Sequence, residues 1–342
     1  MKIYKISRMK EKTPQIKILL AIIDELPPFA GDFLMTRAKE RTLGTRINYA
    51  RNFRTFLNYL IDVYPQCAQK KTKDIDYEDL GRVNALEIDT FLSIYAEDHK
   101  ESAVSNMKTA ISAFYKYACD TLNVLKVNPI NGSAKIKVPK KDYVIYLSAE
   151  EQEKLLNTLK FGTGLTKKQL VFHAHTAKRD TALIFLFLDT GLRVSELCSL
   201  CIKDLDLSDH SLIVMRKRHK MSTIYYSDEA TEYISEYIEE RKTLKPEFSK
   251  AEHPLFLSLQ NEAISVREVQ SLVEKYVRAA LPEKMQKISP HKLRSSFAMS
   301  FYRVTKDILT LQERMGHESL TTTNIYVKAL KENIKNSRNW RT

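Results

Sequence analysis

The residues able to do chemistry begin with a short basic segment near the C-terminus. Ser289 and Pro290 are typical of a helix start, and His291 and Arg294 follow at a spacing of three that places both on one helix face. The free amides and the dipole at a helix start also favour an anion, so a phosphate is a natural ligand here. A solvated surface pair is the competing interpretation.

A second segment offers an oxygen nucleophile. Met315, Gly316 and His317 predict a helix end and a turn, and Ser319 is placed to cap a new helix that contains Tyr326. A phenol has a pKa of about 10, so attack by its oxygen requires positive charge around the target. The neighbouring arginines and histidines offer that charge. The alternative is an ordinary packed tyrosine with its hydroxyl in water, since the chain has 17 tyrosines.

A basic hairpin is predicted in the middle of the C-terminal half. Residues 211–227 contain two runs rich in β-branched and aromatic residues, joined by a basic segment. No other pair of strands is predicted with the same clarity. The tip carries Lys217, Arg218, His219 and Lys220.

The composition favours a polyanionic partner. Lysine and arginine number 55 against 42 acids, which gives a net charge of +13, and phosphate neutralisation makes nucleic acid the first candidate. Four cysteines include a single CxxC pair, Cys198 and Cys201, which favours buried thiols over a zinc site. No leader and no long apolar run is evident, so we expect a cytoplasmic protein without membrane contact.

The N-terminal part predicts a small all-helical domain. Apolar residues recur at helical spacing over residues 45–63 and 102–122, a shorter helix is expected at 85–95, and Pro129 ends the helical pattern. Cations that stay off the apolar stripes are candidates for binding DNA. They are Arg46, Arg51, Arg54 and Lys108.

A lysine-rich connector, residues 132–145, separates this part from a second domain. Ser148 and Glu151 predict a capping box at the first helix of that domain, and residues 181–188 are apolar almost all round, as expected of a central helix. We therefore expect a mainly α fold with a small β-hairpin or sheet (α+β). Its domains are 1–131, with the helical part at about 30–131, and 146–342.

Three segments are informative in their order and spacing: TGLRVSEL at 190–197, HKLRSSF at 291–297 and GHESLTTTNIYV at 316–327. Together they resemble the tyrosine recombinase, or phage integrase, family. The resemblance is specific over about residues 146–330, whereas the N-terminal half matches mainly by size, helicity and position.

The resemblance implies the roles of individual residues. Glu196 would support the site by holding Arg193 through a charge-assisted bond. The hairpin lysine is less clear, because the family usually carries glycines around it and Lys220 is a credible substitute for Lys217. Arg218 and Lys220 join the candidates for binding DNA. The implied catalytic set is Arg193, Lys217, His291, Arg294, His317 and Tyr326.

The resemblance also implies the reaction and the assembly. A 3′-phosphotyrosine forms, a 5′-hydroxyl is released, and strands are exchanged through a four-way junction without metal, ATP or other cofactor. A core-binding helical domain and a larger catalytic domain would close as a C-shaped clamp on double-stranded DNA. Two protomers would bind an inverted-repeat core site and four would form the synapse. The host compartment would be the bacterial cytoplasm, at the nucleoid.

The C-terminal tail and the rival functions leave alternatives open. Residues 327–342 place Lys328, Lys331, Lys335 and Arg338 at helical spacing, so the tail is expected either to dock on a neighbouring subunit or to pack on its own domain. The expected outcome is integration, excision or inversion of DNA, with a mobile element as the favoured source. The rivals are a type IB topoisomerase and a non-cutting DNA-binding or architectural regulator.

Overall fold

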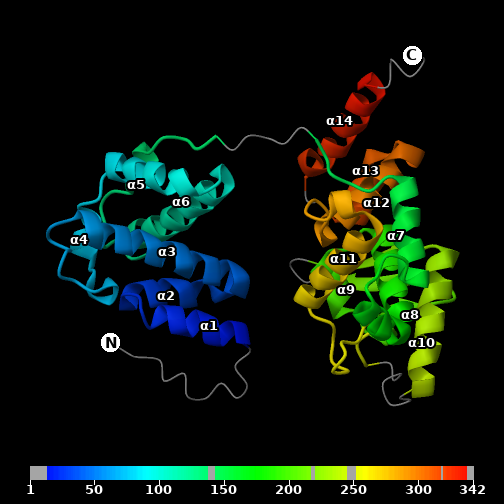
Figure 1. Ribbon diagram of the computed structural model, residues 1–342. Coiled ribbons are helices and arrows are strands. Elements are labelled where there is room, and N and C mark those ends of the chain that lie inside the picture. The colour runs from blue at the N-terminus through cyan, green and yellow to red at the C-terminus, as the bar shows by residue number, and fades with distance from the viewer. Residues whose placement is uncertain (1–13, 138–142, 217–219, 245–251, 317–318, 337–342) are drawn as a thin grey trace. The chain divides into compact units, whose positions relative to one another are not determined.

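The computed structural model describes residues 14–137, 143–216, 220–244, 252–316 and 319–336. Contacts divide the chain into two compact units, Met1–Lys140 and Lys141–Thr342 (Figure 1). The division falls within the lysine-rich connector at 132–145. Each unit has its own apolar core.

The N-terminal unit is built from helices alone in its described part. Its helical part begins at Pro14 and not at about residue 30, because Leu19 and Ile22 of the first helix are buried in the core. The expected later start is therefore corrected. The α-helices are α1 (Pro14–Ile23), α2 (Pro28–Thr36), α3 (Leu43–Val63), α4 (Tyr77–Gly81), α5 (Ala85–Asp98) and α6 (Glu101–Lys116).

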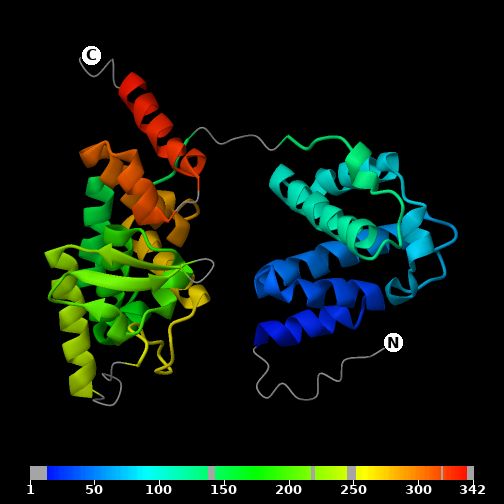
Figure 2. The ribbon, with the colours of Figure 1, turned by 180° about the vertical axis from the view of Figure 1, so that it is seen from behind.

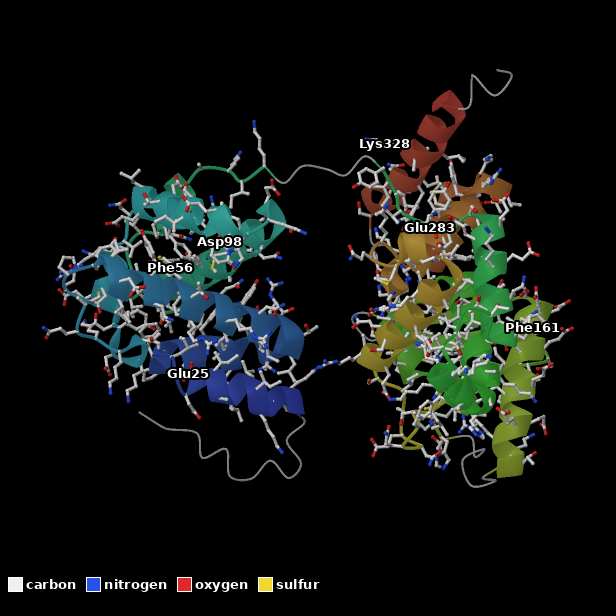
Figure 3. All side chains as sticks on the ribbon, viewed as in Figure 1. Glu25, Phe56, Asp98, Phe161, Glu283 and Lys328 are labelled. Carbon is white, nitrogen blue, oxygen red and sulfur yellow. The ribbon has the colours of Figure 1, made fainter. Side chains whose placement is uncertain are left out.

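The two predicted amphipathic helices form the centre of this unit. Phe56 of α3 and Phe114 of α6 are fully buried, and Phe56 lies inside the unit in Figure 3. Thr42 caps α3 by accepting a hydrogen bond from the Thr45 amide. The helix predicted to reach residue 122 ends as α6 at Lys116 and continues as one π-helical turn, Tyr117–Thr121.

The second unit surrounds a long central helix, α8 (Lys167–Thr190). This helix contacts α7, α10 and α12, and its segment 181–188 is almost entirely buried, as predicted (Figure 1). Ser148 caps α7 with the expected capping box. The α-helices here are α7 (Ala149–Phe161), α8, α9 (Val194–Ser199), α10 (Asp228–Leu244), α11 (Val266–Ala280), α12 (Pro290–Thr305), α13 (Ile308–Met315) and α14 (Leu320–Asn336).

One antiparallel sheet lies on this unit, and Figure 2 shows it in front of the helices. The predicted hairpin is present as β2 (Ser211–Met215) and β3 (Met221–Tyr225). A short strand that the sequence did not predict, β1 (Leu205–Asp206), pairs with β2. The mainly α fold with a small sheet is confirmed.

The last three helices form a smaller apolar cluster beside the main core. Phe297 and Met299 of α12 meet Leu311 of α13 and Tyr326 and Ala329 of α14 in this cluster. The described part of α14 thus packs on α12 and α13 of its own chain, and Lys328 on it is exposed (Figure 3). The side chains of Lys331, Lys335 and Arg338 lie outside the described residues, as does the far end of the tail.

Candidate active site

The turn after α8 brings the first arginine to the site. Gly191 ends α8 with φ of +61°, a left-handed conformation that favours glycine. A Cβ atom at this position would lie 2.2 Å from Cδ1 of Phe297, so any other residue would force the Phe297 ring of α12 to move. Arg193 follows two residues later, immediately before α9.

Glu196, which the resemblance implies as a support for the site, contacts Arg193. Nη1 of Arg193 donates to Oε1 of Glu196 at 2.6 Å, and the Arg193 amide donates to Oε2 at 2.8 Å. The Glu196 side chain is only 6% exposed, whereas that of Arg193 is 32% exposed. Nη2 of Arg193 donates to the carbonyl oxygen of Gly316 at 2.8 Å. The guanidinium is therefore fixed in direction while part of it stays open to solvent.

Arg294 lies deeper, near the start of α12, and is only 4% exposed. Its two terminal nitrogens donate to the carbonyl oxygens of Gly191 and Met315. Burial, with the nearby charge of Arg193, lowers the pKa of Arg294 to about 10. The side chain is thus still a cation at neutral pH.

A third arginine joins this group, although no sequence pattern distinguishes it from its basic neighbours. Arg216 follows β2, and its Nη1 and Nη2 donate to the carbonyl oxygens of Glu313 and Arg314 at 2.8 and 2.5 Å. Burial lowers the pKa of Arg216, an effect that the charge of Glu196 opposes. The three guanidinium groups therefore gather at the C-terminal end of α13.

Ser295, on α12, is a second residue near the site that the sequence did not single out. Ser295 lies one helical turn after His291 and donates to its carbonyl oxygen at 3.1 Å. The Ser295 hydroxyl group also acts on Tyr326, because hydrogen bonding by Ser295 favours a lower pKa of the phenol. His291 is exposed to solvent on one side. Desolvation by the atoms around it, followed by the charges of Lys292 and Arg294, lowers the pKa of its ring. Ser289 precedes the helix as predicted, but its side chain makes no capping bond.

Tyr326 is buried in this structure, with 2% of its surface exposed. Burial raises the pKa of its phenol, and the hydrogen bond with Ser295 and the charge of Arg294 oppose the rise. The hydroxyl is therefore neither free in water nor packed without a polar partner. It lies within the electrostatic influence of an arginine that the sequence placed 32 residues earlier.

Three predicted residues, Lys217, Arg218 and His317, lie outside the described residues. Lys220 is exposed immediately before β3, and its carbonyl oxygen accepts a hydrogen bond from the Arg216 amide at 2.8 Å. The choice between Lys217 and Lys220 as the hairpin lysine thus stays a prediction.

The N-terminal unit contains a basic groove of about 640 Å³ between its helices. Of the four cations proposed there from the sequence, Lys108 lines the groove and also donates to Ser133 Oγ at 2.8 Å. Ser105, Thr109 and Ser112 also line the groove. The cations that line the groove are Arg37, Arg41, Lys108, Lys116 and Lys135.

The other three candidates in this unit lie elsewhere. Arg54 forms a salt bridge with Glu25 at 2.6 Å. Arg46 points to the Leu34 carbonyl oxygen, with Nη1 at 3.5 Å, and its Nε has no partner among the described residues. Arg51 is exposed on α3.

Neither a metal cluster nor a membrane-crossing helix occurs in the described part of the chain. Within it, no three side chains of His, Cys, Asp or Glu gather closely enough to hold a metal ion. No helix formed by these residues has both the length and the apolar character needed to cross a bilayer.

Comparison with known proteins decides the family. The profile described as the phage integrase family matches residues 146–333, more than half of the chain. The chain belongs to the phage integrase family. Tyrosine recombinase XerC of Caldanaerobacter subterraneus subsp. tengcongensis is 31% identical over 313 residues, covering 88% of this chain and 82% of that protein. XerC of Treponema denticola is 29% identical over 303 residues, covering 85% and 94%.

Solved structures have a fold similar to that of this chain. A crystal structure of the XerH site-specific recombinase bound to a palindromic difH substrate has a TM-score of 0.70 at 20% identity, covering 97% of this chain and 90% of that chain. A lambda integrase dimer bound to a COC′ core site has a TM-score of 0.61 at 16% identity, covering 90% and 94%. The resemblance found in the sequence is confirmed, and the chain is an enzyme of the tyrosine recombinase type.

Proposed function

We propose that this enzyme is a site-specific recombinase that cuts and rejoins double-stranded DNA through a 3′-phosphotyrosyl bond to Tyr326. One observation carries the proposal: Arg193 and Arg294, far apart in the sequence, donate to the adjacent carbonyl oxygens of Gly316 and Met315, and the charge of Arg294 also acts on the phenol of Tyr326. Attack on a phosphate by a phenol needs such a concentration of fixed positive charge.

Arg193 and Arg294 are the proposed phosphate ligands. Each guanidinium presents several N–H groups in a rigid fork that matches phosphate oxygens, and neither loses its charge at neutral pH. Arg193, which is partly exposed and held by Glu196, is the more accessible of the two. Together they would neutralise the charge that grows on the pentacoordinate phosphorus.

Two proton transfers accompany the reaction, one at the attacking oxygen and one at the leaving oxygen. As the Tyr326 oxygen bonds to phosphorus, the phenol proton passes to His291, whose lowered pKa favours the neutral ring that accepts a proton. As the bond from phosphorus to the 5′-oxygen breaks, a hairpin lysine, Lys217 or Lys220, donates a proton to that oxygen. His317 would hydrogen-bond a non-bridging oxygen. The 5′-hydroxyl of a partner strand reverses the reaction.

The burial of Tyr326 adds one step to this scheme. With 2% of its surface exposed, the phenol does not reach a DNA phosphate in the described conformation. DNA binding would therefore have to shift α14 so that the phenol becomes exposed. The described conformation corresponds to a resting state in which the nucleophile is protected.

The N-terminal unit is the proposed core-binding domain. Its groove combines cations with serine and threonine hydroxyls, which is a composition suited to a DNA backbone. Arg46, Arg51, Arg54, Arg218 and Lys220 stay proposed contacts. Closure of both units on the duplex would form the C-shaped clamp.

The assembly and the setting are also proposals. XerH and lambda integrase have been solved on recombination-site DNA, the latter as a dimer. By analogy, two copies of this chain would bind an inverted-repeat core site and four would form the synapse, with the tail after Tyr326 exchanged between subunits. The reaction would serve integration, excision or inversion of DNA, with a mobile element as the favoured source, in the bacterial cytoplasm at the nucleoid.

The test is covalent trapping. Wild-type protein and Tyr326→Phe are incubated with nicked, end-labelled DNA that carries the inverted repeats flanking the gene, without added metal or ATP. A nick beside the cleavage site lets the short 5′ fragment diffuse away, so the covalent complex accumulates. We expect a detergent-stable complex on the 3′ side of the break from wild type alone, with equal DNA binding by both proteins.

The other outcomes are informative. Binding by both proteins without a complex from either would favour the non-cutting regulator. A complex on supercoiled DNA of any sequence, with relaxation but no exchange between two marked sites, would favour the topoisomerase.

A further inference from the structure

Arginines from three separate parts of the second unit hold the C-terminal end of α13. Arg216 binds the carbonyl oxygens of residues 313 and 314, Arg294 binds that of Met315, and Arg193 binds that of Gly316. Four successive carbonyl groups thus each receive a guanidinium N–H.

A helix end suits this purpose. The last carbonyl groups of an α-helix lack partners within the helix, and its C-terminus carries a partial negative charge that attracts cations. Because the four carbonyls belong to one short rigid segment, an arginine that fixes part of the segment also fixes the rest. Arg216 holds the last turn with both of its terminal nitrogens, at 2.8 and 2.5 Å.

We propose that Arg216 is a positioning residue for the phosphate site. By fixing the end of α13, it sets the directions of Arg294 and Arg193, which donate to the next two carbonyl groups. The inference rests on the proposed function, because Arg193 and Arg294 are the phosphate ligands there. Arg216 itself contacts no phosphate in this scheme.

The packing around Gly316 supports the role. Gly316 ends α13 with φ of +58°, and a Cβ atom there would lie 2.2 Å from Nη1 of Arg216. The guanidinium therefore lies directly over the glycine, in a space that a larger residue would fill. The Nε of Arg216 is buried without a partner in the described part of the chain, which costs stability. Stability alone thus does not explain an arginine here.

The experiment compares two scissile linkages in single-turnover cleavage at saturating DNA. One substrate has the natural phosphodiester, and the other has a methylphosphonate, in which a methyl group replaces a charged oxygen. The variants are Arg216→Met, which keeps the length but removes the donors, and Arg216→Lys. Arg278→Met is the matched control, because Arg278 is an exposed residue of α11 paired with Glu274.

On the phosphodiester, we expect Arg216→Met to cleave at least about tenfold more slowly than wild type at unchanged DNA affinity, since misdirected charges lower the rate without weakening binding. Arg216→Lys recovers part of the rate, because an ammonium group reaches fewer carbonyls. On the neutral linkage the difference shrinks to within about threefold, because less charge has to be neutralised. Arg278→Met matches wild type on both.

Equal losses on both linkages would overturn the proposal, because they would place the effect in folding or in the leaving group. No loss on either would make Arg216 a bystander. Gly316→Ala displaces the guanidinium without removing it, so it is expected to repeat the pattern if Arg216→Met folds poorly. Failure of wild type to form any covalent complex would instead refute the proposed function itself.

Discussion

Replacing Glu196 with glutamine tests how much the orientation of Arg193 contributes to the reaction. Glu196 accepts two hydrogen bonds from Arg193, at 2.6 and 2.8 Å, and is almost fully buried. A glutamine keeps one acceptor but turns an NH₂ group toward the second donor. Charge-assisted hydrogen bonds contribute about 1.5–3 kcal/mol, and the partial exposure of Arg193 favours the lower part of that range.

A loss of about 2 kcal/mol in the transition state corresponds to a cleavage rate lower by about 30-fold. The rate is measured as covalent complex formed with time on the nicked site at saturating DNA. DNA affinity should stay within about twofold, because Arg193 keeps its charge and binding is spread over many phosphate contacts. Glu274→Gln on α11 removes an exposed partner of Arg278 and should leave the rate unchanged.

Cleavage by Glu196→Gln at the wild-type rate would refute the reasoning, since Arg193 would then need no orientation. Equal losses of rate and DNA affinity would also refute it, because they would show that the carboxylate acts on binding. Thermal unfolding of both variants separates these results from a folding defect.

Three further predictions concern the rest of the molecule. Lys116→Met should reduce the slope of log affinity for DNA against log salt concentration by about 0.9, whereas Arg82→Met, outside the groove, should not; binding titrations at several salt concentrations measure both. His173 is buried with a lowered pKa, so the unfolded state binds more protons below the ordinary pKa of about 6.5 and the free energy of unfolding falls as the pH drops below it. Urea unfolding of His173→Gln should show a weaker fall. Gly191→Ala, which places a Cβ atom 2.2 Å from Phe297 in a left-handed conformation, should lower the free energy of unfolding by about 2 kcal/mol or more in the same assay.

The sequence predicted those elements whose residues carry their own signal. The apolar stripes of α3 and α6 and the capping box at Ser148 depend on neighbours within the same helix, and they were found as expected, except that α6 ends at Lys116 and continues as a π-helical turn. α1 was missed, because Gln15 and Lys17 are the two polar side chains among its ten residues, too few to mark a polar face. β1 was missed because it has two residues, too few for any periodicity.

The site divides in the same way. Arg193 and Glu196 meet because they are three positions apart on the same short segment of the chain. Arg216 meets the end of α13 across 97 residues, and no local pattern records that approach. The burial of Tyr326 is also a tertiary effect, since it depends on how α14 packs on α12 and α13.

The contacts at the end of α13 have one more consequence. Peptide dipoles orient the three guanidinium groups without cancelling their charge, and Glu196 is the one carboxylate that forms a salt bridge with any of them in the described part of the chain. The three cations are therefore already oriented before DNA arrives, and Arg193 alone among them is paired with a carboxylate in the described part of the chain. A phosphate that enters this region meets guanidinium groups whose directions are already set, because the carbonyl groups that hold them belong to the backbone at the end of α13.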